Sequence, residues 1–70
     1  MLNVLKLKGK IVEQGKNVAT VSAELGISTA TFYHKMKTNT FNIMEALELK
    51  KILSLTTEEA SAIFFSDSVA

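Results

Sequence analysis

The sequence predicts an all-α fold, a single compact domain of five helices over residues 1–70. Proline is absent and glycine occurs only 3 times, which favours helices over turn-rich β structure. Apolar residues recur every three or four positions, as they do on the buried face of a helix. Capping residues divide this pattern into segments at about 3–14, 18–25, 29–37, 43–53 and 57–65, and we expect residues 66–70 to fray.

The composition removes several classes of function. Cysteine is absent and His34 is the only histidine, which excludes disulfides, thiol catalysis and multi-histidine metal sites. No nucleophile–base pair stands out, so we expect no enzyme activity, no cofactor, no metal ion and no small-molecule ligand. No apolar run is long enough for a signal peptide or a membrane span, and we therefore expect a cytoplasmic protein without a membrane partner.

The first helix, about 3–14, carries an apolar stripe at Val4, Leu7 and Ile11, and Gly15 follows as its stop. Lysines at positions 6, 8 and 10 give this segment some amphipathic character. A helix lying on a membrane surface is one interpretation of that pattern. Packing as the first helix of a globular domain is the interpretation we favour.

The second helix, about 18–25, begins after Asn17, a residue type that caps helix N-termini well. Val18, Val21 and Leu25 recur at the spacing of an inward-facing stripe. Gly26 then ends the helix, and we expect it to adopt a positive φ angle. The next helix follows so closely that the two must cross at a steep angle.

The third helix, about 29–37, is capped by Ser28, and Ile27 places an apolar side chain in the turn before it. Phe32 and Met36 are four residues apart and share one face, which we expect to anchor the helix to the core. The opposite face carries mainly polar or small side chains, with Tyr33 at its edge: Ala30, Thr31, His34 and Lys37.

The last two helices begin at recognisable capping boxes. Asn42 is followed by Glu45 at the start of the segment 43–53, and Thr56 is followed by Glu59 at the start of 57–65. We expect the fourth helix and its following turn to supply apolar surface through Met44, Leu47, Ile52 and Leu55. We expect the buried stripe of the fifth helix to consist of Ala60, Ile63 and Phe64.

Leu-Gly-Ile-Ser at 25–28, followed by Thr-Ala-Thr-Phe-Tyr at 29–33, resembles the helix-turn-helix of the lambda repressor/Cro-like (XRE-type) family. The resemblance covers roughly residues 4–65 and is nearest to the small Cro-type regulators of phages and prophages. It implies a five-helix lambda-repressor-like DNA-binding domain, with the motif on the second and third helices. It also implies a repressor that binds a double-stranded DNA operator through the major groove, in the cytoplasm of a bacterial host.

The resemblance assigns roles to individual positions. Gly26 matches the turn glycine, and the positions that hold the motif together are Val21, Leu25, Ile27, Phe32 and Met36. The positions that face base edges are Thr29, Ala30, Tyr33 and His34. The positions that contact phosphate are Asn17, Val18, Lys37, Thr38 and Asn39.

Three positions depart from the family pattern. Val18 stands where the family often has glutamine, which touches phosphate and braces the recognition helix. Ser22 stands where alanine or glycine usually lets the two helices approach, and Lys35 stands near a position that is usually apolar. These departures concern the details of DNA contact more than the fold.

Charge and the C-terminal segment leave an alternative open. The net charge is only +1 and arginine is absent, although arginine is the commonest side chain to contact guanine. A protein-interaction module on the same fold, such as an antirepressor or an antitoxin-like partner, is the alternative function. Ile63, Phe64 and Phe65 offer more large apolar groups than one helical stripe can bury, and we expect them to form a homodimer surface.

Overall fold

The computed structural model describes residues 2–65 and confirms an all-α chain with five helices. The helices are α1 (Val4–Glu13), α2 (Val18–Leu25), α3 (Thr29–Thr38), α4 (Ile43–Ile52) and α5 (Thr57–Phe64). Every predicted helix end lies within one residue of the observed end. The predicted fraying of residues 66–70 falls outside the described residues. None of the helices in the described part of the chain is both long and apolar enough to cross a membrane.

Each helix begins at a residue whose side-chain oxygen accepts a hydrogen bond from a backbone N–H of the first turn. These N-caps are Asn3, Asn17, Ser28, Asn42 and Thr56. Both predicted capping boxes are present, with the Glu45 and Glu59 side chains accepting from the N-cap backbone in return. A cap of this kind stabilises a helix by about 1 kcal/mol, which explains why such short helices begin where they do.

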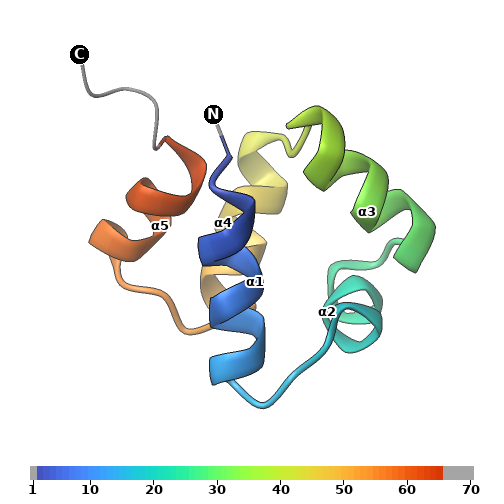
Figure 1. Cartoon of the computed structure of the whole chain (residues 1–70), viewed down its shortest axis with the longest axis horizontal. Coiled ribbons are helices and arrows are strands. Elements are labelled where there is room, and N and C mark those ends of the chain that lie inside the picture. The colour runs from blue at the N-terminus through green and yellow to red at the C-terminus, as the bar shows by residue number, and fades with distance from the viewer. Residues whose placement is uncertain (1, 66–70) are drawn as a thin grey trace.

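The helices surround one core without forming a simple bundle. α2 packs against α3 and α4, while α5 packs against α4 and α1. In Figure 1, α2 and α3 lie together at one side of the molecule, α5 lies at the other, and α1 and α4 cross between them. Leu2 N–H donates to Asn39 Oδ1 (3.1 Å) and Asn3 N–H donates to the Ile63 carbonyl (2.7 Å). The first residues therefore join the end of α3 to α5.

The core draws on all five helices. Its buried apolar side chains are Leu2, Leu7, Ile11, Val21, Phe32, Met36, Leu49, Leu53, Leu55 and Ile63. In the fourth helix the structure differs from the expected apolar positions. Leu49 and Leu53 are fully buried, whereas Met44 and Leu47 are 65% and 49% exposed. The apolar residues of α4 occur around much of its circumference, and packing against α2 and α5 selects the face that is buried.

Three phenylalanine rings connect α3 to α5 through the segment before α4. Phe41 meets Phe32 edge-on, with 5.2 Å between ring centroids, and it meets Phe64 edge-on at 6.4 Å. Such pairs stabilise a fold by about 0.5–1.5 kcal/mol beyond the area they bury. Phe41 therefore links α3 to α5, a role that its position between two helices does not reveal in the sequence.

Candidate nucleic-acid interface

The turn between α2 and α3 fixes the direction of α3. Gly26 has φ +84° and ψ +23°, the left-handed conformation expected from the sequence. Ile27 N–H donates to the Ser22 carbonyl (3.0 Å), which closes the end of α2 in the manner of a Schellman motif. Ser28 then caps α3, with Oγ accepting from Thr31 N–H and donating to Thr31 Oγ1. Few residues separate the helices, so the start of α3 has little freedom.

α3 has one face buried in the core and one face exposed to solvent, which we call the bare face. Phe32 and Met36 are buried in the core, as predicted, and Val21 is fully buried opposite them in α2. Leu25 and Ile27 are half-buried against the same core. The side chains expected to meet DNA from this helix are all exposed: Thr29, Ala30, Tyr33, His34 and Lys37. Nothing in the described residues covers this face.

Tyr33 lies differently from the other predicted base-contacting residues. It lines a hollow of about 290 Å³ together with Val4, Lys8, Met36 and Lys37. It also lines a second hollow of about 330 Å³, whose other residues are Lys8, Ile11, Val12, Lys16, Asn17 and Val18. We call the two hollows together the α1–α3 groove, because Lys8 of α1 and Tyr33 of α3 line both. Tyr33 therefore lies toward α1, at the flank of the bare face.

The α1–α3 groove is positively charged. Lys8, Lys16 and Lys37 line it, and among residues 2–65 no Asp or Glu does. Lys8 and Lys37 form no ion pair within the described residues. Lys16 is partly neutralised, because its Nζ bonds to Glu24 at 2.9 and 3.1 Å. Two unpaired cations thus flank the Tyr33 side chain, and Lys8 is a candidate anion contact that the family resemblance did not assign.

The N-terminus of α2 opens into the same groove. The Asn17 Oδ1 caps the helix by accepting from Thr20 N–H (2.8 Å) and Thr20 Oγ1 (3.0 Å). Because that oxygen is occupied, Asn17 can offer an anion only its amide N–H groups and its backbone. Val18 is half-buried against the core, so only its backbone N–H can serve as a phosphate contact. Helix dipoles favour anions at such N-termini.

The end of α3 offers fewer free groups for a phosphate contact than the sequence predicts. The Thr38 hydroxyl donates to the His34 carbonyl (2.8 Å), which uses its proton within the helix. Asn39 adopts a left-handed conformation (φ +55°), and its Oδ1 accepts from Leu2 N–H. Only the amide N–H groups of Asn39 remain as side-chain donors. Of the predicted contacts at this end, Lys37 is the one with a charged side chain and no internal ion pair.

The residues that depart from the family pattern have structural roles here. Ser22 is buried between helices, and its Oγ donates to the Val18 carbonyl (2.6 Å), so its hydroxyl is satisfied. Lys35, in the last turn of α3, forms an ion pair with Glu45 in the first turn of α4 (3.2 Å). Both side chains of this pair are largely shielded from solvent. Lys35 therefore fixes α3 to α4 and is not available to a ligand.

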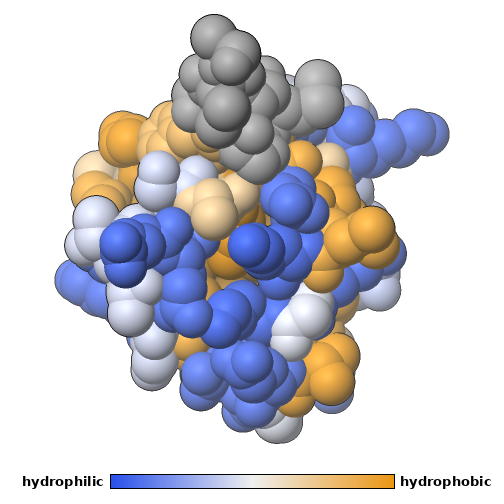
Figure 2. Space-filling view, turned by 60° about the vertical axis from the view of Figure 1, so that its left-hand side comes forward, coloured by the Kyte–Doolittle hydropathy of each residue, from blue (hydrophilic) through white to orange (hydrophobic). Residues whose placement is uncertain are grey.

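The predicted dimer surface at the end of α5 requires a correction. Ile63 is fully buried on the side of α5 that packs against α1 and α4. This confirms its predicted place in the buried stripe and makes its assignment to a dimer surface wrong. Phe64 is half-buried against Phe41, and Phe65 is 53% exposed. In Figure 2, which brings the α5 side of the molecule forward, hydrophilic residues cover the middle of the face and apolar residues gather at its edges.

A scan against protein-family models and searches of curated proteins and of solved structures found no match.

Proposed function

We propose that this chain is a sequence-specific DNA-binding transcriptional regulator, of the kind represented by phage and prophage Cro-type repressors. In this proposal the chain has a lambda-repressor-like fold, and α2 and α3 form a helix-turn-helix. α3 enters the major groove, which is wide enough for one α-helix. Thr29, Ala30 and His34 contact base edges there. The α1–α3 groove receives the sugar-phosphate backbone beside it.

The observation that carries the proposal is the bare face of α3 beside a groove lined with lysines and, within residues 2–65, without carboxylates. DNA affinity depends largely on neutralising phosphates, and a helix without adjacent cations would lack that contribution. Lys8 and Lys37 supply charge on two sides of Tyr33. Because Tyr33 shares this hollow with both lysines, it contacts the sugar-phosphate backbone in this proposal and not a base edge.

The overall charge indicates modest affinity. Only a few phosphates can be neutralised by Lys8, Lys37 and the N-terminus of α2, whereas tight binders commonly use 6–10 such contacts. A homodimer compensates, because two copies of α3 can enter successive major grooves about one helical turn apart. Occupying a palindromic operator in this way would block the polymerase sterically and repress the promoter.

The proposal is tested by selecting binding sites from a pool of random duplex DNA, at low and at near-physiological salt. We expect an enriched motif for the wild type and its loss in the combined variant His34→Ala, Lys37→Ala. Lys6→Ala is the matched control, because it removes one exposed lysine from α1 outside the groove. No enrichment at either salt concentration, with folded protein, would refute sequence-specific DNA binding.

A protein-interaction module, such as an antirepressor or antitoxin-like partner, remains the second candidate function. Ile43, Met44 and Leu47 are 64%, 65% and 49% exposed on α4, and exposed apolar groups that gather in one place favour a protein contact. Salt dependence distinguishes the two functions, because DNA binding weakens steeply as salt rises and an apolar contact does not.

A further inference from the structure

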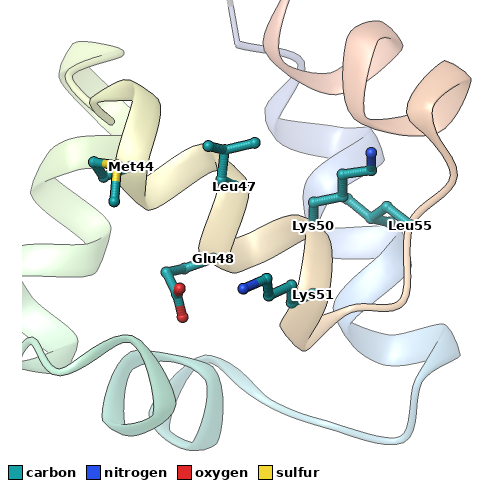
Figure 3. Close-up of a pocket in the computed structure, with 6 residues that line it drawn as sticks. All are labelled: Met44, Leu47, Glu48, Lys50, Lys51 and Leu55. Atoms are coloured by element: carbon teal, nitrogen blue, oxygen red, sulfur yellow. The ribbon is translucent and has the colours of Figure 1, made fainter.

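The exposed face of α4 carries both apolar groups and charges. Met44, Leu47, Glu48 and Lys51 recur at spacings of three and four, which places them on one side of the helix. Together with Lys50 and Leu55 they line a shallow hollow of about 410 Å³ on the surface of α4 (Figure 3). Figure 3 shows Met44 at one end of this surface and Leu55 at the other, with Glu48 and Lys51 between them. We call these residues the α4 surface.

Two charged side chains of the α4 surface lie outside the ion pairs formed among residues 2–65. Glu48 and Lys51 form no ion pair with any described residue, although each of the lysines at 10, 16 and 35 does. Lys50, at the edge, is held by a hydrogen bond to the Thr57 hydroxyl (3.0 Å). An acid and a base therefore lie one helical turn apart beside Met44 and Leu47, which are exposed.

The charges along the α4 surface are self-complementary. If two α4 helices pack antiparallel about a two-fold axis near residues 49 and 50, Glu48 of each copy lies opposite Lys51 of the other. Met44 and Leu47, the exposed apolar groups beside these charges, would be covered by the same contact. An interface with a two-fold axis uses one patch twice, so its charges must pair in just this reciprocal way.

We propose that the α4 surface is the homodimer interface of this chain, with a second copy packed antiparallel on α4. The proposal names the surface that the dimer in the proposed function would use, and it replaces the predicted surface at the end of α5. The surface is one face of a ten-residue helix, so we expect a weak dimer whose population depends on protein concentration. Because it is tested without DNA, its failure would leave DNA binding by a monomer or by another dimer intact.

The direct test is the concentration dependence of mass by sedimentation equilibrium, using the full chain from about 5 µM to about 1 mM, a range set to bracket a weak interface. We expect the wild type to move from monomer to dimer across this range. Glu48→Lys and Lys51→Glu each place like charges opposite one another and should weaken the dimer at least about tenfold. Lys6→Glu on α1 is the control for a charge reversal elsewhere and should leave the dimer unchanged.

A mixing experiment separates reciprocal pairing from a general effect of charge. Glu48→Lys presents two lysines and Lys51→Glu presents two glutamates, so an equimolar mixture should form heterodimers although neither variant dimerises well alone. The double variant Glu48→Lys, Lys51→Glu should also regain the wild-type mass profile. Circular dichroism of every variant establishes that it is folded, and Leu47→Lys provides a second disruption that does not depend on Glu48 or Lys51.

Any of four results would overturn the proposal. One is a wild type that remains monomeric at about 1 mM, well above the range expected for a weak interface. Another is a dimer that persists in Leu47→Lys and in both charge variants, which would place the contact on another surface. The third is a mixture of the single variants that fails to associate although both are folded. Binding of a different protein to the α4 surface of a monomeric chain would likewise contradict a second copy as its partner.

Discussion

α3 and α4 each present an exposed face, and the two faces differ in chemistry. The face of α3 is polar, and the groove beside it is lined by lysines without a described carboxylate. The face of α4 is apolar at Ile43, Met44 and Leu47 and carries charges of both signs, one glutamate and two lysines. A surface with charge of a single sign suits a polyanion, whereas an apolar surface with both signs suits a copy of itself.

The same comparison explains why a net charge of +1 does not exclude DNA binding. Glu13, Glu24, Glu45 and Glu59 form ion pairs with Lys10, Lys16 and Lys35, so seven of the charged side chains are locally compensated. The remaining cations are distributed unequally, with Lys8 and Lys37 on the α1–α3 groove. The placement of the unpaired charges therefore carries more information than their sum.

The largest expected effect is on the free energy of unfolding, when one apolar side chain is truncated on α3 and, for comparison, one on α4. Phe32→Ala removes a fully buried ring from the core side of α3 and should cost about 3–5 kcal/mol, enough to unfold a domain of this size. Leu47→Ala removes a half-exposed side chain from α4 and should cost less than about 1 kcal/mol in monomer stability. Urea denaturation at low protein concentration measures both. Similar costs for the two variants would contradict the assignment of buried and exposed faces.

A smaller effect is expected at the turn between α2 and α3, which orients α3. Gly26→Ala meets no atom within 4 Å, so its cost of about 1–2 kcal/mol would arise from the positive φ angle alone. Gly9→Ala is the matched control, because Gly9 lies inside α1 with no neighbour within 4 Å and without a positive φ. There alanine should stabilise by about 0.5–1 kcal/mol. Thermal melts of the two variants should thus shift in opposite directions, and a shift of both in the same direction would be inconsistent with the turn geometry.

DNA binding distinguishes the two surfaces through its salt dependence. Lys8→Gln should lower the slope of log affinity against log salt by about 1, because it removes one phosphate contact from the α1–α3 groove. Lys51→Gln removes an unpaired lysine from the α4 surface and should leave the slope unchanged. Fluorescence anisotropy on a duplex with a single half-site measures both variants under conditions in which dimerisation contributes nothing. Equal losses of slope would show that the lysines act only through overall charge.

The smallest effect is on the pH dependence of stability, through an ion pair that lies on neither surface. Lys10 of α1 bonds to Glu59 of α5 and to Glu13, and these bonds raise the pKa of Lys10 above its ordinary 10.5. The bond from Lys10, followed by the Thr56 backbone, lowers the pKa of Glu59 below its ordinary 4.5. The contribution of Glu59 to stability is therefore complete above about pH 4.5 and is lost as pH falls through its lowered pKa.

At the alkaline end the sign is reversed. The contribution of Lys10 is complete below about pH 10.5 and is lost as pH rises through its raised pKa. The melting temperature should therefore be nearly constant between these limits and decline on either side. Glu59→Gln keeps a side-chain acceptor for the capping box and should reduce the decline in acid. An unchanged acid decline in this variant would assign the effect to other carboxylates.

The helix boundaries could be predicted because caps are local. Asn42 and Glu45, and Thr56 and Glu59, determine helix starts through bonds between residues only three positions apart. Gly26 likewise reveals the turn, because few other residues adopt a positive φ angle readily. The inward positions of α2 and α3 follow from periodicity, since each has one apolar stripe with polar or small residues opposite.

The remaining features depend on contacts between distant segments. α4 has apolar residues on more than one side, so nothing in its own sequence shows that Leu49 and Leu53 are buried and Met44 and Leu47 exposed. Similarly, Tyr33 of α3 and Lys8 of α1 line the same hollow because the fold brings distant segments together, which no local pattern encodes.

The most direct test of the central claim is a nuclear magnetic resonance titration of the isotope-labelled chain with the selected duplex at low salt. The proposed function predicts the largest amide shifts at Lys8, Asn17, Val18 and residues 29–37, with residues 43–51 little changed on a single half-site. Shifts confined to residues 43–51, or no shifts in a folded chain, would contradict the assignment of α3 as the helix that meets DNA.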